Sequence, residues 1–208
     1  MVSAIASPAV AYCDCLEDIK QRLAKVSRIL LGHSPMKHEG LDAEVVFLLL
    51  RKSLEQIAFS SLIAHKDIYE KVHADFAKTW RVKKLLERLE DIHPNFYPKP
   101  VDGPSVDEKG IRHFLDVKEG FLTRDEFVFL YDKCSEVLHT WNPFRQDPRV
   151  VHTARPMAEW VQRIHRLLNI HYVQLVDMDE VWLVEMHNAV DGKVHAYPAT
   201  SPPPGAAP

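Results

Sequence analysis

The sequence has few cysteines, few glycines and no long apolar run. It contains 3 Cys in 208 residues. Cys13 and Cys15 lack the C-x-x-C spacing of redox and zinc sites, so we expect reduced thiols and no disulfide framework. No run of about 18 apolar residues occurs, which excludes a predicted membrane span. The first residues lack the positive charge of a secretion signal. We therefore expect a cytoplasmic protein that does not associate with membranes.

The chain also lacks a charge excess and the common cofactor motifs. Its formal net charge is −3, so no overall positive field would attract nucleic acid. It contains no phosphate-binding loop, no dinucleotide fingerprint, no H-E-x-x-H metal motif and no G-x-S-x-G nucleophile motif. We expect neither a cofactor nor a bound metal.

With 7 Gly and an apolar content of 46%, the composition favours helices. The longest helical pattern, Leu41–His65, contains no Pro and no Gly. Leu50, Leu54 and Ile57 mark its main apolar stripe, and apolar residues on its other faces predict that neighbouring elements surround it. Four further helices are predicted over 12–31, 67–91, 123–140 and 156–170, the third opened by a capping-box pattern from Thr123 to Glu126.

The apolar period changes after residue 171. Runs of β-forming residues at 172–176, 181–187 and 193–197 predict antiparallel strands, with Asp191-Gly192 as a turn. Residues 101–122 are predicted to form a long surface connection, with a short helix near 111–117. We expect one mainly α domain, a four- to five-helix bundle with a small C-terminal antiparallel β hairpin. Its segments are a flexible N-terminus (1–9), the helical bundle (10–171), the hairpin appendage (172–198) and a disordered tail (199–208).

Arg51 and His139 form the first candidate catalytic pair. Arg51 lies on one line of the central helix with Glu55, and charges on so apolar a helix need partners. His139 lies in the last turn of the helix that begins at Thr123, about one turn after Ser135, where the negative helix end favours protonated histidine. An arginine and a histidine together suit phosphodiester chemistry, the first binding phosphate and the second transferring a proton.

Two further Arg–His spacings are weaker candidates. Arg166 and His171 match R-x4-H, and Arg145 and His152 match R-x6-H. Five helical residues would place Arg166 and His171 about 140° apart, so they meet only if the helix ends between them. Pro148 places the second match in a loop.

A basic line on the helix over 67–91 is the candidate nucleic-acid contact. Arg81, Lys84 and Arg88 would share one helix face and could bind a phosphate backbone. Glu87 and Glu90 interrupt the line, so an ordinary solvated face remains the alternative.

Two segments carry a resemblance to a known family. LLLRKSLEQIAFSSLIA resembles the central helix of HEPN-like bacterial helical-bundle proteins, and LYDKCSEVLHTWNPF is similar to the Tyr–Ser–His helix of several families of that type. The resemblance implies an up-and-down bundle. In catalytic members it implies a dimeric, metal-independent ribonuclease with an R-x4–6-H motif, often in toxin–antitoxin or phage-defence systems. The family motif has a polar residue after the arginine, whereas Leu167 follows Arg166 here.

Two functions therefore stay open. The first is an RNA-directed, HEPN-like bacterial protein, a ribonuclease in defence or stress, whose partners would be RNA, an antitoxin or other protein, and a second copy of the chain. The second is a non-catalytic helical interaction or structural module, in which Arg51 with Glu55 and Ser135 with His139 only lock helices together. A solvent-reachable cleft with Arg51 and His139 within about 8 Å would favour the first.

Overall fold

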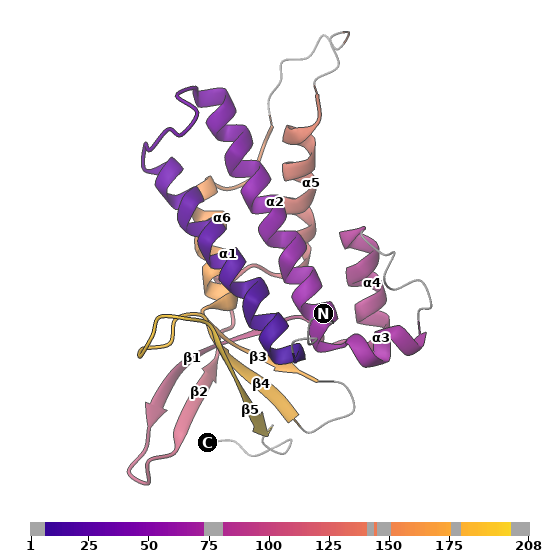
Figure 1. Ribbon diagram of the computed structural model, residues 1–208, viewed down its shortest axis with the longest axis vertical. Coiled ribbons are helices and arrows are strands. Elements are labelled where there is room, and N and C mark those ends of the chain that lie inside the picture. Colours follow the sequence, from indigo (N-terminus) through magenta and orange to yellow (C-terminus); the bar gives the residue numbers. More distant parts are fainter. Residues whose placement is uncertain (1–6, 73–80, 141–143, 145–150, 176–179, 201–208) are drawn as a thin grey trace, which may run out of the picture.

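Long helices occupy one end of the molecule and an antiparallel sheet the other (Figure 1). The computed structural model describes residues 7–72, 81–140, 144, 151–175 and 180–200. Its helices are α1 (Pro8–Leu30), α2 (Glu39–Ala64), α3 (Lys66–Val72), α4 (Val82–Ile92), α5 (Arg124–Leu138) and α6 (Met157–Leu168). Its strands are β1 (Lys99–Val106), β2 (Arg112–Asp116), β3 (Ile170–Gln174), β4 (Glu180–Glu185) and β5 (His195–Thr200). None of these helices is long and apolar enough to cross a membrane.

α1 begins at a helix-starting sequence and buries one regular stripe of apolar side chains. Pro8 suits the first helical position because its φ is fixed and it has no N–H to satisfy. The Ser7 hydroxyl caps the helix by accepting a hydrogen bond from the Val10 N–H. The fully buried side chains follow at alternating spacings of four and three residues: Tyr12, Leu16, Ile19, Leu23 and Val26. This stripe faces α2, α6 and the sheet.

α2 is the predicted central helix. Leu50, Leu54 and Ile57 have no exposed surface, and the helix packs against α1, α4 and α5. The prediction that other elements surround α2 on all faces is wrong, since Leu41 is 43% and Leu48 is 44% exposed. Part of α2 near its N-terminus therefore lies open among the described residues.

The five strands form one sheet with the order β2-β1-β3-β4-β5, and every neighbouring pair is antiparallel. α1 packs on this sheet through Tyr12, whose ring meets Trp182 of β4 edge-on at 5.8 Å. The predicted C-terminal strands are confirmed as β3, β4 and β5. The predicted fold class needs correction, because β1 and β2 lie within the range expected to be a helical bundle. The fold is mixed α and β, not a bundle with a small hairpin.

Residues 99–116 form a β hairpin where the sequence predicts a surface connection and a short helix. In the turn that reverses the chain, the Asp107 carboxylate accepts hydrogen bonds from the backbone N–H groups of Lys109 and Ile111. The strand β1 could not be recognised from the sequence, because it contains residue types that disfavour strands: Pro100, Gly103 and Pro104. Gly103 is required by the pairing, since its φ is +126° and a Cβ would lie 2.8 Å from the His113 carbonyl oxygen.

Three predicted boundaries also differ. Pro8 and Ala9 belong to α1, not to a flexible segment over 1–9; residues 1–6 lie outside the described residues. The single helix predicted over 67–91 is two helices, because α3 ends at Val72 and Arg81 has an extended backbone before α4; residues 73–80 are not described. β5 continues to Thr200, inside the tail predicted over 199–208; residues 201–208 are not described.

The predicted capping box at the start of α5 is confirmed. Thr123 Oγ1 accepts a hydrogen bond from the Glu126 N–H at 3.3 Å, and the Glu126 carboxylate accepts one from the Thr123 N–H at 3.2 Å. Arg163 of α6 and Arg155 also donate to this carboxylate. Burial raises the pKa of Glu126, but the hydrogen bonds from Arg163 and Thr123 and the two guanidinium charges outweigh it and lower the pKa below its ordinary value. Glu126 therefore stays ionised and joins α5 to α6.

We expect Thr123→Ala to lower the free energy of unfolding by about 1 kcal/mol, because the Glu126 N–H loses its acceptor. Chemical denaturation of the purified chain measures the loss. Thr123→Ser is the matched control, since serine keeps the capping oxygen. Equal stabilities of the two variants would show that the cap contributes nothing.

Candidate functional site

Arg51 lies where α2 meets α5, and its charge is engaged on two sides. Its Nε lies 3.2 Å from the Glu55 carboxylate, and its Nη2 donates to the Tyr131 hydroxyl at 3.3 Å. The guanidinium carbon is 5.2 Å from the centre of the Tyr131 ring, a cation–π distance. Partial burial lowers the pKa of Arg51, but Tyr131 and Glu55 more than compensate and raise it. The Arg51 side chain is 28% exposed, so its main contacts lie within the protein.

His139 does not reach this cluster. It is the C-terminal cap residue of α5, its backbone N–H donates to the Ser135 carbonyl, and it is exposed. Arg51 contacts α5 at Tyr131, eight residues earlier, which corresponds to about 12 Å along a helix. The Ser135 hydroxyl donates to the Tyr131 carbonyl and not to His139. Within the described part of the chain, no hydrogen bond or ion pair joins Arg51 to His139.

Arg166 and His171 contact different partners, although α6 does end between them as the R-x4-H match requires. Arg166 makes a two-pronged ion pair with Asp102 of β1, at 2.7 and 2.6 Å, on the exposed surface. His171 of β3 has no exposed surface. Its Nε2 lies 2.8 Å from the Tyr12 hydroxyl and its Nδ1 lies 2.9 Å from the Leu168 carbonyl oxygen. Burial lowers the pKa of His171 to about 4, so the imidazole is neutral at pH 7 and belongs to the core.

The basic line lies on α4. Arg81, at its N-terminal cap, and Lys84 are exposed, and Arg88 is half-buried. Spacings of three and four residues place them on one face of the helix. Lys83 pairs with Asp132 of α5 at 2.7 Å and helps to hold α4 in place. The phosphate contact stays a prediction.

The described residues give no support to a site at the R-x6-H match, a metal site or a cysteine nucleophile. Arg145 of the R-x6-H match lies outside them, and His152 is exposed. Among the residues that the structure describes, no three His, Cys, Asp or Glu side chains are grouped so that they could hold a metal ion. Cys13, Cys15 and Cys134 are free thiols. Burial raises the pKa of Cys134 to about 12, so that thiol is not activated as a nucleophile.

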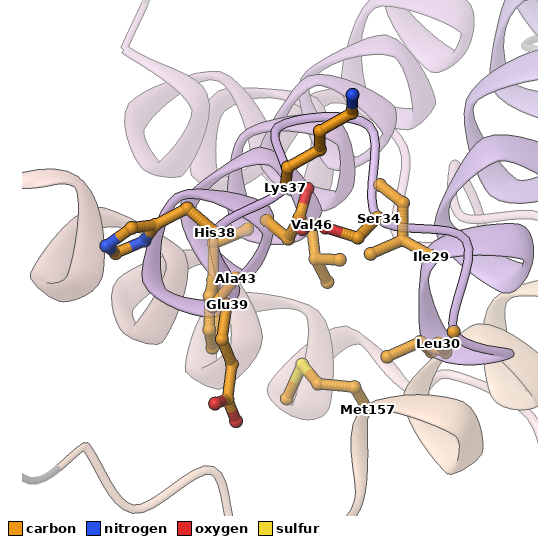
Figure 2. A pocket seen from close by; sticks show the side chains of 12 residues that line it. Ile29, Leu30, Ser34, Lys37, His38, Glu39, Ala43, Val46 and Met157 are labelled. Atoms are coloured by element: carbon orange, nitrogen blue, oxygen red, sulfur yellow. Dashed lines mark hydrogen bonds between the residues drawn. The ribbon is translucent and has the colours of Figure 1, made fainter.

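Two hollows lie beside the connection between α1 and α2, and the sequence predicted neither. We call them the inner hollow and the outer groove. The inner hollow, about 670 Å³ in volume, lies between this connection and α6 (Figure 2). In Figure 2, Lys37 points away from Met157 of α6, whereas the Glu39 carboxylate extends to the same side as Met157. The lining of the inner hollow combines apolar side chains, among them Ile29, Val46 and Met157, with the polar side chains of Ser34 and Asp42.

Asp42 holds this connection in shape. Its carboxylate accepts hydrogen bonds from the Ser34 hydroxyl and, at 3.0 Å, from the Met36 N–H. The hydrogen bond from Ser34 is the main reason that the pKa of Asp42 is lowered, and the backbone N–H groups of Met36 and His38 act in the same direction. The ionised carboxylate thus fixes the loop that separates the two hollows.

The outer groove, about 880 Å³ in volume, is lined by residues of α1, the connecting loop and α2. Its floor is aliphatic: Ile29, Pro35, Val45 and Leu49. Its rim is cationic or neutral: Lys25, Arg28 and His33. None of the three rim side chains has a hydrogen-bond or ion-pair partner within the described ranges. Among the residues that the structure describes, no Asp or Glu lines the groove.

The sequence does contain an indication of the surface around the α1–α2 connection. Several apolar residues there lie outside the buried helical stripes. Leu31 and Met36 fall in the loop between the helices and are 81% and 51% exposed. Leu41 and Leu48 of α2 lie four and three residues from Val45, on the side away from Leu50 and Leu54. Apolar side chains outside a buried stripe mark an uncovered surface.

No protein-family model, curated protein or solved structure matches this chain. The contacts and surfaces described above therefore carry the functional argument.

Proposed function

We propose that the chain is a non-catalytic helical interaction module that binds a partner protein at the free end of the α1–α2 pair. The observation that carries this proposal is the engagement of Arg51 by Glu55 and Tyr131, away from His139. Phosphodiester cleavage needs both groups at one phosphate. The separate contacts of Arg166 and His171 support the same conclusion.

The exposed apolar residues at the end of the α1–α2 pair support binding of a partner. Leu31, Met36, Leu41 and Leu48 are exposed close to one another in the sequence of this helical hairpin. Leu41 and Leu48 share one face of α2 because they are seven residues apart, and exposed apolar residues on one face are typical of protein-binding sites. The three free thiols suit a reducing compartment, and this supports our proposal of a cytoplasmic location.

The alternative function is a HEPN-like ribonuclease, and an assay of RNA cleavage together with stability measurements tests it. We expect no cleavage of single-stranded RNA by the purified wild-type chain. His139→Ala should leave the free energy of unfolding unchanged within about 0.5 kcal/mol, because its side chain is exposed. Arg51→Ala should lose about 1–2 kcal/mol, because it removes hydrogen bonds to Glu55 and Tyr131 at the α2–α5 contact.

An RNA gel and a denaturation curve for each protein decide between the two functions. RNA cleavage that disappears in both His139→Ala and Arg51→Lys, with unfolding unchanged, would establish a ribonuclease and overturn the proposal. Arg51→Lys is informative because an ammonium group keeps the charge but not the planar hydrogen-bonding geometry of a guanidinium.

A further inference from the structure

The outer groove combines an aliphatic floor with a cationic rim. Ile29, Val45 and Leu49 are half-buried side chains of the two helices, so they present apolar surface without being sealed in the core. Lys25 and Arg28 are exposed and have no ion-pair partner among the described residues. Such a surface is complementary to a ligand with apolar groups at its centre and negative charges at its edge.

We propose that the outer groove binds an amphipathic helix of a partner protein, with aliphatic side chains on one face and carboxylates beside them. The inference rests on the proposed function and names the class of partner. From Lys25 to Ile29 the α1 side of the groove extends over about 6 Å, which matches roughly one turn of a bound helix. A helix laid between α1 and α2 would bury the groove floor by ordinary helix–helix packing.

The rim charges favour an acidic partner over a second copy of this chain. In a two-fold symmetric dimer the same face meets itself, and the described residues that line the groove include no Asp or Glu that could pair with Lys25 or Arg28. Facing like charges weakens such an interface. Carboxylates on a different protein would instead pair with both cations.

The floor favours a protein helix over RNA. None of the described residues that line the groove is Phe, Tyr or Trp, so they offer bases no broad aromatic side chain on which to stack. Of the described lining residues, Lys25, Arg28 and His33 alone could supply positive charge, whereas the floor offers aliphatic contacts that a phosphate backbone does not use.

The test uses the full chain and a synthetic peptide of about 18 residues, with Leu on one helical face and Glu on the other faces. Two peptides serve as controls: one has Lys in place of every Glu, and one has the acidic composition in scrambled order. Fluorescence anisotropy measures binding. We expect the acidic helix to bind at least about tenfold more tightly than either control, and more weakly as salt rises from about 50 to about 300 mM.

Two variants locate the binding surface. Lys25→Glu/Arg28→Glu should weaken binding by about tenfold or more, because both rim attractions become repulsions. The matched control, Lys109→Glu/Lys118→Glu, reverses two exposed cations in and after the β1–β2 hairpin and should leave affinity within about twofold. Val45→Asp should also abolish tight binding, since a carboxylate on the groove floor repels the acidic helix and disrupts its apolar contact. Circular dichroism checks that each variant is folded.

Several results would overturn the inference. These are no binding of the acidic helix up to about 1 mM, equal binding of the scrambled or basic peptide, or equal loss with the Lys109/Lys118 control. Binding of an RNA oligonucleotide that Lys25→Glu/Arg28→Glu removes would assign the groove to nucleic acid. Self-association of the chain that this variant removes, detected by sedimentation, would assign it to a second copy. RNA cleavage dependent on His139 would overturn the proposed function, whereas a failure of peptide binding alone overturns only the groove assignment.

Discussion

Leu54→Ala is expected to lower the free energy of unfolding by about 2–5 kcal/mol, because it leaves a cavity in the middle of α2. Leu54 has no exposed surface, and α2 packs against α1, α4 and α5 around it. The truncation removes apolar contacts and opens a space that close-packed neighbours fill only in part. Ile57→Ala should cost a similar amount, since Ile57 is also fully buried.

Leu48→Ala is the matched control on the same helix. Leu48 is 44% exposed, so its truncation should change stability by only about 0.5 kcal/mol. Chemical denaturation with urea gives the free energies of unfolding for all three variants and the wild type. A loss below about 1 kcal/mol for both Leu54→Ala and Ile57→Ala would remove α2 from the centre of the core.

His171 is expected to make the fold sensitive to acid. It is fully buried, and its pKa is lowered from 6.5 to about 4 by burial. The Leu168 carbonyl can only accept a hydrogen bond, so Nδ1 carries the proton and Nε2 accepts from the Tyr12 hydroxyl. Burial raises the pKa of Tyr12, so its hydroxyl remains a donor.

The direction of the pH effect follows from proton binding. Between pH 6.5 and about 4 the unfolded chain protonates His171 while the folded chain does not. Stability from this group is therefore complete above pH 6.5 and falls as the pH drops towards 4. From pH 7 to 4.5 the loss attributable to His171 should be about 2–3 kcal/mol.

The measurement compares wild type with His171→Gln by urea denaturation across this pH range. Glutamine cannot titrate, and all other ionisable groups are the same in both proteins. The wild type should therefore lose about 2–3 kcal/mol more than the variant on acidification. Parallel stability curves would mean that His171 keeps its ordinary pKa in the folded protein.

The candidate site illustrates how far a single sequence can be read. Arg51 and Glu55 are four residues apart on one helix, so their pairing could be predicted from spacing alone. Tyr131, the other partner of Arg51, is 80 residues away, and no local pattern indicates it. The expected Arg51–His139 pair depended on how α5 sits along α2. Two turns along a helix are enough to separate residues that a pattern places together.

By itself, the sequence determined α1, α2, α5 and α6, together with the β-rich C-terminal segment. Helical spacing and a capping box act over three or four residues, so their physical effect is present in any short stretch that contains them. The β1–β2 hairpin, the sheet order and the neutral state of His171 were decided only by the tertiary structure. Tyr12 and His171 are 159 residues apart, and the burial that lowers the pKa of His171 exists only once α1 has packed on the sheet. The outer groove likewise arises only when α1 and α2 pack together, because each helix alone carries no more than one side of it.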